Sequence, residues 1–219
     1  MEHLHIVMGN HLKEDKKIIE KYAKDVFSYY NGKLQKSNLE GFKGHYRLHL
    51  KNTIPIPIIT ITFEPSFSQR IGLIVQESYF SSKAFPKKEA ESNFFDFIDL
   101  AIAMMKASKN SFFIGSFEPG STSPEQDVPI QVLFFKDKEY LPYLREHIRF
   151  SFKIKFSVNL DIPEKELDKL VGRYATINKK YGEYTLICFY PFVGKQDENF
   201  PTGRFYREVK NLKNENPKN

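Results

Sequence analysis

The most regular hydrophobic pattern in the chain lies at residues 149–158, where apolar and polar side chains alternate strictly. Because side chains alternate between faces along a β-strand, this pattern predicts a strand with two unlike faces. The apolar face would comprise Phe150, Phe152, Ile154, Phe156 and Val158, and the polar face Arg149, Ser151, Lys153, Lys155 and Ser157. A shift of one residue would bring the polar side chains into the core, so we expect a fixed register.

Other short segments rich in β-branched and aromatic residues predict further strands. They span residues 4–8, 45–50, 58–63, 71–80, 112–117, 128–135, 184–190 and 203–209. Several of them follow one another at hairpin distance, which favours antiparallel pairing over a parallel, doubly wound sheet.

Apolar residues recur at helical spacing in residues 12–30, 86–108, 137–147 and 161–174. The segment at 86–108 is the longest, and its apolar side chains cover more than half of the circumference. We therefore expect it to pack across the sheet. Pro142 lies inside the third segment and should either kink that helix or mark its true start.

Together these elements predict an α+β fold, with a largely antiparallel, twisted sheet packed against a long apolar helix and with further amphipathic helices. No stretch of linker composition separates the two halves of the chain. We therefore expect a single domain over residues 1–209 and a disordered C-terminal tail over residues 210–219.

Composition narrows the function classes only modestly. The 219 residues include 21 Phe, 12 Tyr and no Trp, which indicates an aromatic-rich core or a ring-lined groove. The net charge of +6 permits attraction to anionic partners without requiring it. Cys188 is the only cysteine, which fits a reducing, cytoplasmic location. No apolar run reaches membrane-spanning length, so we expect no membrane association.

Histidines and carboxylates give no specific catalytic or metal motif. His3 and His5 would share one strand face and His45 and His49 another. Zinc needs three or four converging ligands, so surface histidines are the favoured interpretation.

The carboxylate candidates for acid–base chemistry are Glu64 with Glu118, and Asp96 with Asp99. The glycine- and serine-rich residues 120–124 resemble an anion-binding turn in composition, but they lack the phosphate-loop spacing. We therefore assign no catalytic residue, no metal site and no cofactor.

Basic residues give the one candidate site. Arg149, Lys153 and Lys155 would lie on the polar face of the strand at 149–158, and Arg204 and Arg207 on a later strand. These five residues predict a non-enzymatic cytoplasmic binding or regulatory module. It would recognise a partner protein or a small anionic ligand through a basic sheet face and an aromatic-rich groove. Two alternatives remain open: a nucleic-acid-associated protein that uses the same face, and an enzyme of unfamiliar type.

Overall fold

The computed structural model of the protein describes residues 3–8, 33–36, 46–49, 58–64, 70–81, 83–107, 109–117, 130–156, 160–189 and 201–215. The chain divides into two compact units, Met1–Ser123 and Pro124–Asn219, and each is described by itself. The predicted helix at residues 12–30 and the loop at residues 120–124 lie outside the described residues. The prediction of a single domain over residues 1–209 stays a prediction.

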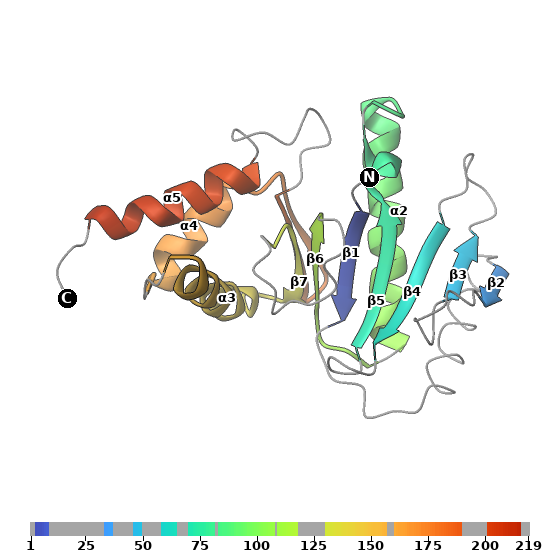
Figure 1. Ribbon diagram of the computed structural model, residues 1–219, viewed down its shortest axis with the longest axis horizontal. Helices are drawn as coiled ribbons and strands as arrows, with labels where there is room; N and C mark the ends of the chain where they lie inside the picture. Colours follow the sequence, from blue (N-terminus) through green and yellow to red (C-terminus); the bar gives the residue numbers. More distant parts are fainter. Residues whose placement is uncertain are drawn as a thin grey trace. The chain divides into compact units, whose positions relative to one another are not determined.

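The first unit contains a six-stranded antiparallel sheet in the order β2-β3-β4-β5-β1-β6 (Figure 1). Strand β1 lies between β5 and β6, and its Ile6 is opposite Leu73 on one side and Gly115 on the other. The strands are β1 His3–Met8, β2 Lys33–Lys36, β3 Tyr46–His49, β4 Ile58–Glu64, β5 Arg70–Gln76 and β6 Phe113–Phe117.

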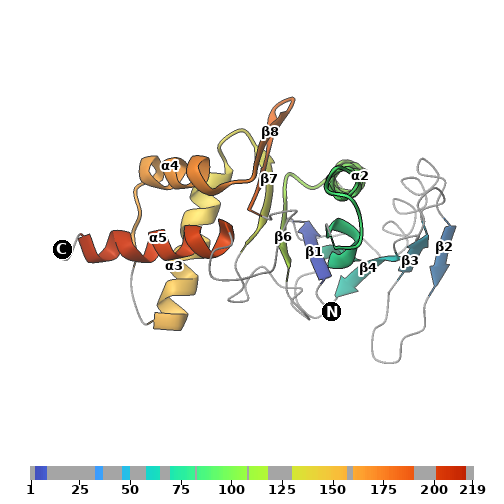
Figure 2. The same ribbon diagram turned by 90° about the horizontal axis from the view of Figure 1, so that it is seen from above.

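A 3-10 helix, η1 Glu77–Phe80, leads from this sheet towards helix α2 Lys87–Ala107. Helix α2 runs along one face of the sheet (Figures 1 and 2). Four rings gather where η1 meets α2: Phe80 lies 5.5 Å from both Tyr79 and Phe94 and 5.7 Å from Phe97, between ring centroids. We call these four residues the Phe80 cluster.

The second unit contains a three-stranded antiparallel sheet in the order β7-β9-β8, together with three helices. Helix α4 packs against both α3 and α5, and α3 also contacts β7. The elements are β7 Val132–Lys136, α3 Tyr140–Phe156, α4 Glu164–Tyr174, β8 Ile177–Tyr181, β9 Tyr184–Cys188 and α5 Pro201–Glu215.

The predicted α+β class and the antiparallel sheet are confirmed. The description of the helix at 86–108 as apolar is not, because α2 is amphipathic: Phe94, Phe97 and Met104 are buried, whereas Asp96 and Asp99 are exposed. No helix among the described residues is both long and apolar enough to cross a membrane.

The predicted strand at residues 149–158 is wrong, because residues 149–156 form the second half of helix α3. Beyond the first turn of α3, the side chains described as buried follow helical spacing: Leu144, His147, Ile148, Ser151 and Phe152. Two of these five are polar, and they lie together inside the protein, with His147 Nε2 3.5 Å from Ser151 Oγ. The alternating pattern had placed Ser151 on the solvent-exposed face of a strand, but Ser151 is buried in the helix. Alternation of apolar and polar residues was therefore a misleading guide to the secondary structure here.

The predicted strand at residues 203–209 is also wrong, because it lies within helix α5. Phe205 and Val209, one helical turn apart, are fully buried. Helix α5 continues to Glu215, so residues 210–215 of the predicted disordered tail are helical. Strands β2 and β8 were not predicted, since each is short and rich in lysine.

Candidate interaction surface

The five predicted site residues lie on two helices of the second unit, not on a sheet. Arg149, Lys153 and Lys155 belong to α3, and Arg204 and Arg207 belong to α5. The predicted basic sheet face does not form. On a helix, residues three or four apart are neighbours, so the structure brings Arg149 beside Lys153 and Arg204 beside Arg207. These four residues are exposed.

Two ion pairs accompany the cations of α3. Arg149 Nη1 lies 3.8 Å from Glu146 Oε1, one helical turn earlier. Arg145 Nη1 lies 3.6 Å from Glu164 Oε1, at the first residue of α4. Both pairs are exposed to solvent and therefore add little stability, but the second joins α3 to α4.

The rings beside these cations belong to the core. Phe152 and Phe205 are buried, and Phe205 packs against Phe189 at 4.7 Å between ring centroids. The hydroxyl of Tyr206 accepts a hydrogen bond from the backbone N–H of Ile130 at 3.1 Å. These rings therefore do not stand exposed beside the cations, as a base-stacking surface would require.

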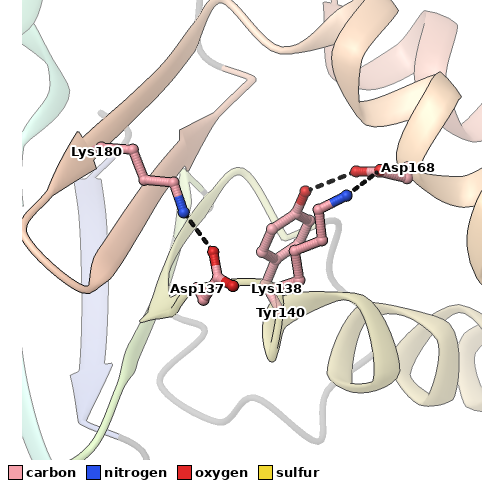
Figure 3. Close-up of polar contacts among 5 residues, drawn as sticks. All are labelled: Asp137, Lys138, Tyr140, Asp168 and Lys180. Carbon is pink, nitrogen blue, oxygen red and sulfur yellow. Dashed lines mark hydrogen bonds and ion pairs between the residues drawn. The ribbon is translucent and has the colours of Figure 1, made fainter.

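A polar network that the sequence did not reveal centres on Asp168 of α4 (Figure 3). Lys138 Nζ donates to Asp168 Oδ2 at 2.7 Å, and the hydroxyl of Tyr140 donates to Asp168 Oδ1 at 3.0 Å. Both carboxylate oxygens are thus used. Because Lys138 lies in the turn between β7 and α3, and Tyr140 begins α3, these three residues tie that turn to α4. We call them the Asp168 network.

The same turn is also tied to the β8–β9 hairpin. Asp137 has a φ of 42°, in the left-handed region that aspartate tolerates better than most residues. Its backbone N–H donates to the carbonyl oxygen of Glu183 at 2.7 Å, and its carboxylate pairs with Lys180 (Figure 3). Lys136 Nζ lies 2.9 Å from Glu183 Oε2. The turn is therefore joined to the hairpin by backbone and side-chain contacts.

The contacts in the Asp168 network favour the charged forms of Asp168 and Lys138 and the neutral form of Tyr140, and they shift the three pKa values accordingly. The hydrogen bond from Lys138 is the main reason that the pKa of Asp168 is lowered, and the bond to Asp168 in turn raises the pKa of Lys138. Burial, followed by the bond to Asp168, raises the pKa of Tyr140. All three shifts lead away from neutrality, whereas an acid–base catalyst needs a pKa near the working pH. We conclude that the network is a structural tie.

The other candidates are dispersed. His3 and His5 lie on β1 and His49 on β3, with β5 and β4 between these two strands; His45 lies outside the described residues. Within the described part of the chain, no group of three His, Cys, Asp or Glu side chains could hold a metal ion.

Of the two carboxylate pairs, Asp96 with Asp99 lies on the exposed side of α2, and Glu64 with Glu118 stays a prediction. Burial raises the pKa of Asp96, and the neighbouring charge of Asp99 adds to the effect. Glu118, the predicted companion of Glu64, lies outside the described residues.

No protein-family model and no curated protein matches the chain. Among solved structures the chain is similar to the Pseudomonas aeruginosa T6SS protein PA0821, with 9% sequence identity and a TM-score of 0.44. The match covers 95% of this chain and 72% of that chain. A resemblance this weak carries no argument about function.

Proposed function

We propose that the protein is a non-enzymatic binding module that recognises an acidic surface of a partner protein through the exposed cations of α3 and α5. The supporting observation is that Arg204 lies in the first turn of α5 and that this first turn contains no acidic residue. The N-terminal end of a helix disfavours positive charge. The first turn of α5 therefore does not stabilise the charge of Arg204, and an acidic partner surface would do so.

Helix α3 adds a second segment of one sign. The chain has no Asp or Glu from residue 147 to residue 160, and this stretch contains Arg149, Lys153 and Lys155. Cations are favourable near the C-terminal end of a helix, so the helix dipole alone can account for Lys153 and Lys155. Helix α3 by itself therefore supports a partner less strongly than α5 does. It supports the proposal because α3 and α5 pack against the same helix, α4.

A partner protein is preferred to a small ligand or a nucleic acid. The cations are exposed and spread along two helices, which suits a broad acidic surface. Nucleic-acid binding would be supported by exposed rings beside the cations, and Phe152 and Phe205 are buried instead. The absence of a catalytic motif and the pKa directions in the Asp168 network favour a non-enzymatic role. A cytoplasmic location stays a prediction.

Binding to immobilised poly-glutamate and to single-stranded DNA tests the proposal. The double variant Arg204→Ala/Arg207→Ala should bind poly-glutamate more weakly than the wild type, and its binding should depend less on salt. The matched control is Lys87→Ala/Lys88→Ala, which removes two exposed cations from the start of α2 and changes the net charge equally.

An equal loss in both double variants would show that only net charge matters, which contradicts the proposal. Stronger binding to DNA than to poly-glutamate, abolished by the arginine substitutions, would favour the nucleic-acid alternative instead.

A further inference from the structure

We infer that the outer edge of strand β8 binds an acidic, extended segment of a partner protein, which adds to the sheet as a further strand. This site goes beyond the proposed function, because it involves neither α3 nor α5. It also follows from different observations: the backbone geometry of β8 and the charge that β8 carries.

The geometry of the hairpin determines which backbone groups of β8 point outward. Strand β8 pairs with β9 on one side, and no other described strand lies on its other side. The hairpin has a two-residue turn, since Tyr181 lies opposite Tyr184. Residues that flank such a turn exchange hydrogen bonds with each other. The backbone groups of Tyr181, Lys179 and Ile177 therefore point towards β9, and those of Asn178 and Lys180 point outward.

The outward side of β8 is accessible and basic. Asn178, Lys179 and Lys180 are all exposed. Lys179 Nζ lies 5.0 Å from the centroid of the Tyr181 ring, on the same face of the strand. Lys180 lies on the opposite face, where it pairs with Asp137. An added strand would therefore meet the ammonium group of Lys179 on one face and the Lys180–Asp137 ion pair on the other. Between them lie the outward backbone N–H and C=O groups of Asn178 and Lys180.

Charge selects the occupant of this edge. Lysines on an edge strand discourage pairing with a second copy of the same chain. If two copies of β8 paired about their centres, Lys179 would lie beside its counterpart, and like charges in that position are destabilising. The same lysines attract a strand with acidic residues opposite them. Strand addition gains its affinity from main-chain hydrogen bonds and its specificity from such side-chain contacts.

A short peptide provides the probe. The sequence Val-Glu-Glu-Thr-Val, run antiparallel to β8, places its two glutamates opposite Lys180 and Lys179. Titration of the ¹⁵N-labelled full chain with this peptide should shift the amide resonances of Asn178 and Lys180 in NMR spectra. A control peptide with lysine in place of both glutamates should cause no shift.

Two changes each remove one of the two outward hydrogen bonds expected at Asn178. Asn178→Pro deletes an N–H that points away from β9, a position where edge strands accept proline. We expect peptide binding to weaken by about tenfold in this variant. The control Asn178→Ala keeps the N–H and should bind within about twofold of the wild type. A peptide N-methylated at the amide that faces Asn178 removes the reciprocal bond, which the peptide N–H donates to the Asn178 carbonyl, without altering the protein.

Three outcomes would overturn the inference. The first is unchanged affinity for both Asn178→Pro and the N-methylated peptide. The second is a set of shifted resonances that map to α3 or α5 rather than β8. The third is a concentration-dependent shift of the β8 amides without peptide, which would indicate pairing between two copies. Arg204→Ala/Arg207→Ala should leave peptide binding unchanged, so this inference and the proposed function can fail separately.

Discussion

The Phe80 cluster of the first unit and the Asp168 network of the second both tie a helix to the segment beside it, but by different means. The Phe80 side chain is fully buried and is surrounded by other rings. The Asp168 side chain is 36% exposed and is held by one ammonium group and one hydroxyl. Burial of rings does not depend on pH and is worth several kcal/mol, at about 25 cal/mol per Å². An exposed carboxylate tie is weaker and depends on its ionisation.

The largest expected effect is that of Phe80→Ala. Removing a fully buried ring leaves a cavity among Tyr79, Phe94 and Phe97, and should lower the free energy of unfolding by about 3–5 kcal/mol. Urea unfolding at neutral pH, followed by circular dichroism, measures the change. Phe95→Ala is the matched control, because Phe95 is half-buried in the same helix. An equal loss in both variants would show that burial at Phe80 is not what holds this region.

A smaller effect is expected from Tyr140→Phe. The residue is only 3% exposed, so phenylalanine keeps the buried ring and removes only the hydroxyl that donates to Asp168. The free energy of unfolding should fall by about 1 kcal/mol. In the background of Asp168→Asn the same substitution should cost less, because the charged acceptor is gone. Equal costs in both backgrounds would mean that the hydroxyl and the carboxylate do not interact.

The smallest effect concerns acidic pH and separates the two regions most directly. The pKa of Asp168 is lowered below its ordinary value of 3.8 in the folded protein. Its stabilising contribution is therefore present above that value and is lost as the pH falls through the lower, folded-state pKa. The stability difference between wild type and Asp168→Asn should shrink between about pH 5 and pH 2.

The corresponding difference for Phe80→Ala should stay constant over the same pH range, because no charge is involved. Urea unfolding at several pH values gives both quantities. A constant difference for Asp168→Asn would show that this carboxylate contributes nothing as an anion. A pH-dependent difference for Phe80→Ala would remove the contrast between the two regions.

Local patterns were enough to predict much of the sheet and two of the helices. Strands β1, β4, β6 and β9 and helices α2 and α4 lie where apolar patterns predicted them. In α4 the buried residues Leu167, Leu170 and Val171 follow helical spacing. Helix α3 shows where this reasoning fails. Its buried stripe includes His147 and Ser151, which contact each other, and no local pattern reveals that two polar residues will be buried together.

The Asp168 network could not be predicted, because Tyr140 and Lys138 precede Asp168 by 28 and 30 residues in the chain. Most of this separation is helix α3. Only the packing of α4 against α3 brings them together. Four of the five basic residues are exposed, Arg149, Lys153, Arg204 and Arg207, but their arrangement depends on the secondary structure. Arg149 and Lys155 would share the face of a strand. In helix α3 they are six residues apart, which is not one of the three- or four-residue spacings that make neighbours on a helix.

Cys188 gives the second unit a chemical reporter of its own. It is the only cysteine in the chain, its side chain is fully buried at the end of β9, and its carbonyl oxygen accepts hydrogen bonds from the backbone N–H and the hydroxyl of Thr176 at 2.7 and 3.0 Å. Because the side chain is fully buried, a thiol reagent can reach the sulfur only when the structure around Cys188 opens. The rate of thiol labelling under native conditions therefore measures how often the surroundings of Cys188 open.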